Sequence, residues 1–174
     1  SNKTAVLLFE KPSVRTKLSF WKSVQLLNGN PIYFGPEEVG LGKRESIKDV
    51  ASVIGRMADL AIIRTFSHNS LNQFTKFSQI PVINALSDGE HPCQALADIL
   101  TMYEIHKNLN SISVAFIGDA NNVAKSLAFA ISGIGGTLNL ASPPGYGFNK
   151  NTIEKINDFG PGLINQIEDP FEAV

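Results

Sequence analysis

The opening of the chain constrains the fold most, because an apolar run leads directly into a turn rich in hydroxyls and positive charge. Residues 5–9 are all apolar and predict a buried strand. Apolar residues then recur at the spacing of a helix: Leu18, Trp21, Val24 and Leu27. A strand that feeds a helix in this way is typical of α/β proteins, and the unpaired N–H groups at such a helix start favour an anion.

The turn itself carries groups that suit a phosphate. Ser13 and Thr16 have hydroxyls that can donate hydrogen bonds, and Arg15 offers a planar fork of donors that matches phosphate oxygens. We interpret Ser13-Val14-Arg15-Thr16 as a phosphate cradle. The alternative is an ordinary helix cap, in which Ser13 caps the helix and Arg15 lies in solvent.

Composition excludes several classes of protein. The 174 residues suit one large domain or two small ones, and a net charge of −1 argues against binding nucleic acid by counterion release. The one cysteine rules out an internal disulfide and favours a reducing compartment, so we expect a cytoplasmic protein. No apolar run is long enough to span a bilayer, and we see no signal peptide. Because the chain starts on a core strand, we expect it to be cut from something longer.

Strands and helices are expected to alternate. The expected strands are residues 5–9, 31–34, 60–64, 81–84, 113–117 and 137–141, and the expected helices are residues 15–27, 46–57, 70–77, 93–106, 123–134 and 152–158. This order predicts an α/β fold with doubly wound parallel sheets, whose ligands bind at the carboxyl ends of the strands. Residues 109–111 look like a boundary, so we expect domains at 1–109 and 110–174, the second incomplete.

A second motif lies at residues 91–94, His-Pro-Cys-Gln, before a helix with the apolar face Leu96, Ile99, Leu100 and Tyr103. His91 can donate a hydrogen bond to a carbonyl oxygen, and Gln94 can accept from an amide. The alternative is a histidine that only caps its helix. A helix start also lowers a thiol pKa, but no His/Asp partner presents itself, so we expect Cys93 to be a small buried thiol.

Other polar residues follow predicted strands. Arg64 ends an apolar strand, and either reaches solvent or points into a site. Residues 118–122, Gly-Asp-Ala-Asn-Asn, lack the later glycines of a dinucleotide fingerprint and suit a small polar ligand instead, unless they form only a turn and a cap. The three histidines lack the spacing of metal ligands, so we predict no metal site.

Four ordered motifs together resemble the carbamoyltransferases, most closely the ornithine enzymes. The motifs are residues 9–16, residues 45–49, residues 91–98 and residues 118–122, and the resemblance covers essentially the whole chain. It implies a carbamoyl-phosphate domain followed by an incomplete ornithine domain. It also implies transfer of the carbamoyl group from carbamoyl phosphate to the δ-amine of L-ornithine, which gives L-citrulline and phosphate in arginine biosynthesis or the urea cycle, without a cofactor.

The resemblance assigns roles residue by residue. It implies that Ser13, Val14, Arg15 and Thr16 bind the phosphate, with valine here in place of the family's threonine. Arg64, His91 and Thr16 would donate to the oxyanion. Gln94 would bind carbamoyl phosphate by orienting the NH₂ group of the carbamoyl moiety, and Asn122 would bind ornithine.

Relatives form trimers in which a neighbour's loop completes each site, so we expect a homotrimer with residues 36–44 in that position. Gly40 falls where many relatives have glutamine, which leaves Lys43 or Arg44 as candidates to reach across. The family's N-terminal helix and its later ornithine motif are absent from this sequence. Two alternatives therefore stay open: a transcarbamylase for aspartate, putrescine or an acylated ornithine, and a non-catalytic module that binds carbamoyl phosphate.

Overall fold

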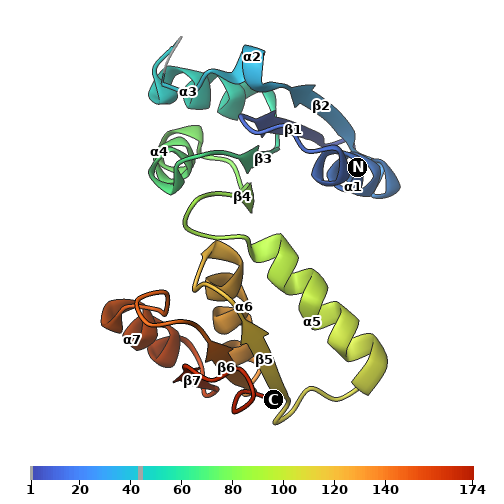
Figure 1. Ribbon diagram of the computed structural model, residues 1–174. Helices are drawn as coiled ribbons and strands as arrows, with labels where there is room; N and C mark the ends of the chain where they lie inside the picture. The colour runs from blue at the N-terminus through green and yellow to red at the C-terminus, as the bar shows by residue number, and fades with distance from the viewer. Residues whose placement is uncertain (1, 43–44) are drawn as a thin grey trace. The chain divides into compact units, whose positions relative to one another are not determined.

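The computed structural model describes residues 2–42 and 45–174, and its α/β fold holds two parallel sheets (Figure 1). Packing divides the chain into two compact units, residues 1–89 and residues 90–174. Each unit has its own sheet and its own core. The predicted α/β class is therefore confirmed.

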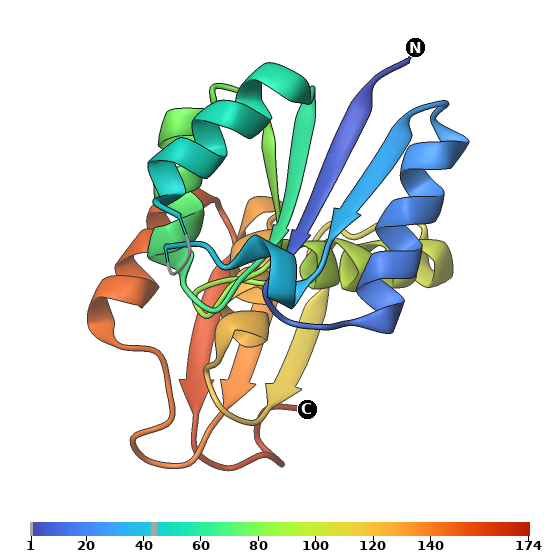
Figure 2. The same ribbon diagram turned by 90° about the horizontal axis from the view of Figure 1, so that it is seen from above.

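The first unit alternates strands and helices. Its elements are β1 (Thr4–Phe9), α1 (Val14–Leu26), β2 (Asn30–Phe34), α2 (Pro36–Val39), α3 (Ile47–Met57), β3 (Leu60–Arg64), α4 (His68–Ser78) and β4 (Val82–Leu86). In the described residues the strand order is β2-β1-β3-β4, and all pairs are parallel (Figure 2). The chain therefore leaves β1 toward β2 and returns to the other side of β1 with β3.

Alternate residues of β1 serve the two faces of this sheet. Val6 and Leu8 pack in a cluster with α3 and α4, whereas Leu7 and Phe9 pack in a second cluster with Phe20 of α1. Figure 1 accordingly shows α1 on one side of the sheet and α3 and α4 on the other. Helices on both faces bury the central strand completely, which explains its continuous apolar run.

The second unit contains α5 (Pro92–His106), β5 (Ser113–Ile117), α6 (Asn122–Gly133), β6 (Thr137–Ala141), α7 (Lys150–Phe159) and β7 (Leu163–Ile167). Its described strands are parallel in the order β5-β6-β7. Leu138 and Leu140 of β6 pack against α6, and Ile156 of α7 joins the same core. On β6 between those leucines, Asn139 donates to the carbonyl of Ala173 at 3.1 Å.

Two predicted helix faces are right only in part. On α1, Leu18 and Leu27 are exposed, whereas the predicted Val24 packs against the core together with Phe20, which was not predicted. On α5, Leu96, Leu100 and Tyr103 are exposed, whereas the predicted Ile99 packs against the core together with Met102, and Ala95 is buried. The spacing identified both helices and one core-contacting residue on each.

Two elements were not predicted. Strand β7 lies at the edge of its sheet, and two consecutive polar residues, Asn165 and Gln166, interrupt its apolar residues. Helix α2 is a single turn within residues 36–44, the segment that was expected to be a loop. Lys43 and Arg44, the candidates for reaching a neighbour, lie outside the described residues.

Candidate functional site

The start of α1 is fixed by its serine. Ser13 is the N-cap in extended conformation: its Oγ accepts from the Thr16 amide at 3.4 Å and donates to Thr16 Oγ1 at 2.9 Å. Both hydroxyls are part-buried at the turn after β1. The cap that the sequence offered as the plainer alternative is therefore present.

The same helix start keeps the features that suit an anion. Its first turn contains no acidic residue, so no carboxylate of that turn offsets the positive end of the helix dipole. Arg15 is exposed, and Val14 is 84% exposed. A ligand can therefore approach the amides of this turn from solvent. Arg15 can contact such a ligand directly, because its side chain is exposed and not packed in a core.

Arg64 lies beside this turn in the sheet. It ends β3, pairs with Phe9 at the end of β1, and follows an irregularity in the pairing of β3 with β4. The chain passes from β1 to β2 on one side of β1 and then crosses to β3 on the other side. The carboxyl ends of β1 and β3 therefore form the switch point at which ligands bind in such sheets. The structure thus brings Arg64 and the Ser13 turn to one edge.

The surroundings of Arg64 are partly dry. Burial lowers the pKa of its guanidinium, although the group stays protonated at neutral pH. Within the described part of the chain, its Nε atom is buried and has no hydrogen-bond partner. A donor left in this state costs free energy, and an incoming anion would satisfy it.

Two residues that the sequence reasoning missed support Arg64. The buried Thr65 hydroxyl donates to the Glu10 carboxylate, and the Glu10 amide donates to the Arg64 carbonyl at 2.8 Å. The Thr65 hydroxyl also accepts from the Ser67 amide at 3.2 Å. A polar residue directly after each apolar strand was the signal that could have revealed this pair.

In the second unit, His91 is the N-cap of α5, and Pro92 follows at the first helical position. The His91 amide donates to Ser126 Oγ at 2.8 Å, and its carbonyl accepts from the Gln94 amide at 3.1 Å. The imidazole makes no side-chain cap bond to its own helix. The histidine therefore occupies the cap position without capping through its ring.

Gln94 is exposed, and its Nε2 donates to Asp98 Oδ1 at 2.9 Å, one turn along the same helix. This bond directs the amide nitrogen to the carboxylate and leaves the Gln94 oxygen to accept from another group. Beside it, Cys93 is half-buried, and burial raises the pKa of its thiol. A protonated thiol is a poor nucleophile, in line with the expected inert role.

The two asparagines after β5 have different roles. Asn121 is the N-cap of α6, and its Oδ1 accepts from the Val123 and Ala124 amides at 2.9 and 3.1 Å. Asn122 is the first residue of the helix and is half-buried. Capping occupies the first asparagine. The second is the residue that the family resemblance assigns to ornithine, and that assignment stays a prediction.

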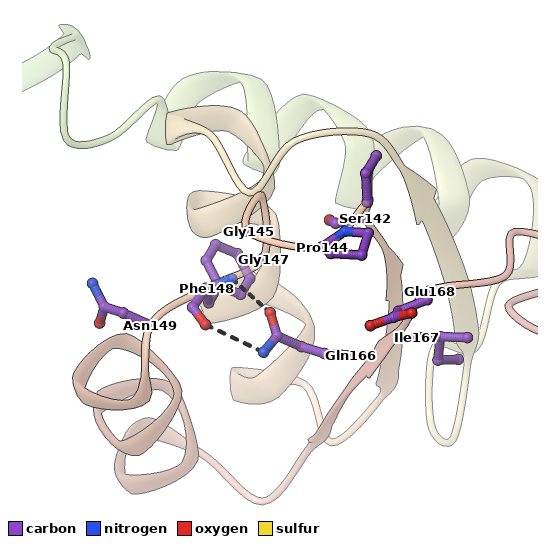
Figure 3. A pocket seen from close by; sticks show the side chains of 10 residues that line it. Ser142, Pro144, Gly145, Gly147, Phe148, Asn149, Gln166, Ile167 and Glu168 are labelled. Atoms are coloured by element: carbon purple, nitrogen blue, oxygen red, sulfur yellow. Dashed lines mark hydrogen bonds between the residues drawn. The ribbon is translucent and has the colours of Figure 1, made fainter.

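A separate hollow of about 440 Å³ opens at the carboxyl ends of β6 and β7 (Figure 3). Gln166 holds its loop in place: Oε1 accepts from the Phe148 amide at 2.5 Å, and Nε2 donates to the Phe148 carbonyl at 3.2 Å. None of the predicted site residues lines this hollow. It therefore plays no part in the candidate site.

Within residues 2–42 and 45–174, no group of three or more His, Cys, Asp or Glu side chains could hold a metal ion. Nor is any helix in those ranges both long and apolar enough to cross a membrane.

The site residues fall in segments that two family profiles match. Residues 1–104 match the aspartate/ornithine carbamoyltransferase carbamoyl-P binding domain, and residues 110–174 match the Asp/Orn binding domain of the same enzymes. The chain belongs to the aspartate/ornithine carbamoyltransferase family. The resemblance seen in the four motifs is therefore confirmed.

Individual members of this carbamoyltransferase family agree. The chain is 42% identical to ornithine carbamoyltransferase of Methanocaldococcus jannaschii over 98% of its length and 57% of that protein, and 43% identical to that of Prochlorococcus marinus over 100% of its length and 57% of that protein. The solved ornithine carbamoyltransferase of Pyrococcus furiosus superposes with a TM-score of 0.96 at 35% identity, covering all of this chain and 56% of that one. The chain thus spans little more than half the length of these carbamoyltransferases.

The first family profile ends at residue 104 and the second begins at residue 110, whereas packing groups α5 with the second unit. The predicted boundary between residues 109 and 110 stays a prediction. So do the roles given to single residues.

Proposed function

We propose that this chain carries the carbamoyl-phosphate site, and part of the acceptor site, of an enzyme that carbamoylates the δ-amine of L-ornithine. The products are L-citrulline and phosphate. The switch point between β1 and β3 is the observation that supports this most, because it gathers the Ser13 turn and Arg64 at one sheet edge. The similar proteins named ornithine carbamoyltransferase favour ornithine as the acceptor.

The phosphate end of the substrate is assigned to the first turn of α1. Ser13 and Thr16 offer hydroxyls, Val14 offers its backbone amide, and Arg15 offers its fork of N–H donors. These donors stabilise the phosphate as it leaves with the electrons of the broken C–O bond. The positive end of the helix dipole adds to the same effect.

The family resemblance assigns the carbamoyl end to Arg64, His91, Thr16 and Gln94. The neutral δ-amine attacks the carbonyl carbon, and the carbonyl oxygen becomes an oxyanion to which the first three of these residues donate. Each such donor typically contributes about 3 kcal/mol to the stability of the transition state. The carbonyl forms again as the C–O bond to phosphate breaks, and the proton given up by the attacking nitrogen leaves with the phosphate. Gln94, oriented by Asp98, accepts from the carbamoyl NH₂ through its free oxygen, and Asn122 binds ornithine. No covalent intermediate, metal or cofactor is needed.

We further propose a homotrimer in the cytoplasm, serving arginine synthesis or the urea cycle, in which residues 36–44 approach a neighbour's site. Gly40 and Gly42 have left-handed backbone conformations, which bend that segment sharply. Such conformations are strained for most other residues. The single cysteine suits a reducing compartment. Light scattering of the complete gene product tests the trimer, and a monomer would contradict it.

A second candidate function is the one left open by the sequence: a module that binds carbamoyl phosphate without turnover. Assays of the complete gene product with ornithine, aspartate and putrescine separate these functions. We expect citrulline to form fastest; ureidosuccinate formed as fast would contradict the ornithine assignment, and no product with any amine would favour the binding module.

Calorimetry with carbamoyl phosphate tests the phosphate site on the chain itself. Arg15→Ala should weaken binding about tenfold or more, since a charge-assisted bond is lost. Lys22→Ala is the matched control, because Lys22 is an exposed cation further along the same helix. Equal affinities of the wild type and Arg15→Ala would refute the cradle.

A further inference from the structure

A chain of polar contacts joins the start of α5 to α6. Ser126 is 4% exposed, and its hydroxyl accepts from the His91 amide at 2.8 Å. The same hydroxyl donates to Glu90 Oε2 at 2.5 Å, and Lys125 pairs with Glu90 Oε1 at 2.9 Å. All four residues belong to the second unit, so these contacts lie within one compact body.

These contacts fix the backbone on both sides of His91. The φ and ψ angles of His91 are −135° and 64°, which are neither helical nor those of a regular strand. Ser126 holds its N–H, and the first turn of α5 holds its carbonyl through the Gln94 and Ala95 amides. With both peptide groups held, the direction of the Cα–Cβ bond is fixed, and this bond aims the imidazole.

Glu90 determines which way the hydroxyl of Ser126 points. A serine hydroxyl has one proton and two lone pairs. Because the proton goes to the Glu90 carboxylate, a lone pair remains for the His91 N–H. A hydroxyl that donates to an ionised carboxylate forms one of the stronger hydrogen bonds in proteins, and Lys125 keeps that carboxylate in place.

We propose that Ser126 and Glu90 are positioning residues for His91, and this inference rests on the role proposed above for that histidine. Ser126 lies one turn after Asn122 on α6. The contacts therefore hold the candidate oxyanion donor in a defined place on the helix that also carries the candidate ornithine ligand. Neither residue touches the substrate in this proposal; both act through His91.

The test uses Ser126→Ala in the complete gene product. We expect kcat for citrulline formation to fall roughly tenfold to hundredfold, because a small misplacement of a catalytic group has effects of that size. The KM for ornithine should change by less than about threefold, since the acceptor's ground-state binding is untouched. Ser126→Thr should restore most of kcat, because it keeps the hydroxyl at a position that borders an apolar groove with Phe129 and Ala130.

Ser132→Ala is the matched control. Ser132 is also buried on α6, and its hydroxyl donates to the Ile156 carbonyl at 2.9 Å, so the variant loses a comparable bond without any link to His91. It should lower thermal stability and leave kcat as in the wild type. Hydrogen exchange of the His91 amide gives a second readout: Ser126→Ala should speed it, and Ser132→Ala should not.

Two further variants make every outcome informative. If Ser126→Ala does not fold, Glu90→Ala takes its place, because Glu90 is partly exposed. This variant removes the acceptor that orients the Ser126 hydroxyl, so it should lower kcat in the same way. If His91→Ala loses turnover while Ser126→Ala and Glu90→Ala keep the wild-type kcat, the positioning role is overturned and the proposed function stands. If His91→Ala also keeps the wild-type kcat, the role of His91 fails, and the positioning proposal fails with it.

Discussion

The Thr65 hydroxyl donates to the Glu10 carboxylate and so joins the chain just beyond β1 to the chain just beyond β3. The Glu10 amide bonds the Arg64 carbonyl at 2.8 Å, so side chain and backbone both tie the two strand ends. Thr65 is fully buried, and its hydroxyl is shielded from water. These bonds hold Arg64 at the sheet edge where the chain enters the Ser13 turn.

Thr65→Val should destabilise the protein by about 1–3 kcal/mol, because the part-buried Glu10 carboxylate loses its donor. It should also weaken carbamoyl phosphate binding, because Arg64 is held less firmly. Urea unfolding and calorimetry measure the two effects. Thr75→Val is the control: its hydroxyl donates to the Leu71 carbonyl at 2.9 Å within α4, so binding should not change. Wild-type affinity in Thr65→Val would contradict a role at the site.

The two neighbouring asparagines should separate stability from binding. Asn121→Ala removes the N-cap of α6 and should cost about 1 kcal/mol of unfolding free energy. Asn122→Ala leaves that cap in place and should raise the KM for ornithine in the complete gene product. Chemical unfolding and steady-state kinetics measure these effects. The reverse pattern, with binding lost only in Asn121→Ala, would show that the ligand residue is the first of the pair.

Asp59 should make stability depend on pH in the acid range. Its carboxylate accepts from Lys3 Nζ at 2.6 Å and from the Thr4 amide at 2.9 Å, and these bonds hold its pKa below the usual value. A lowered folded-state pKa means that the contribution is present above the unfolded pKa of about 3.9 and is lost as the pH falls through the folded value.

Asp59→Asn should therefore unfold at lower urea than the wild type at neutral pH. The difference should vanish in strong acid, and high salt should reduce it, because the Lys3 pair is exposed. Urea midpoints measured across pH check this. A difference between the two proteins that does not vary with pH would rule out the ionised carboxylate as the cause.

Cys93 should react slowly with alkylating reagents. Burial raises the pKa of its thiol, so the thiolate that reacts is scarcer at neutral pH than in a free cysteine with a pKa of about 8.5. The rate of reaction with iodoacetamide should rise only at higher pH than it does for the chain unfolded in urea, which serves as the reference. A folded chain that reacts at least as fast would show an activated thiol and reopen the nucleophile interpretation.

Secondary structure followed from local sequence where short, largely apolar runs stood between turns. β3, β5 and β6 have the predicted bounds, 60–64, 113–117 and 137–141. β7 was missed because Asn165 and Gln166 interrupt its apolar residues at a sheet edge. The buried sides of α1 and α5 were predicted correctly only at Val24 and Ile99, because an apolar spacing of three and four residues describes several faces of a helix equally well. On α5 the small Ala95 is buried, while Leu96 beside it is 65% exposed.

The sequence alone determined the family, the α/β class and the segments that carry chemistry, because those depend on short ordered patterns such as Ser13 to Thr16 and His91 to Gln94. Only the tertiary structure decided that the end of β3 lies next to that of β1, that Glu10 bonds Thr65, and that Ser126 holds His91. Those contacts join residues 35 to 55 positions apart. Sheet order and helix packing create them, and neither is encoded in the local periodicity of the chain.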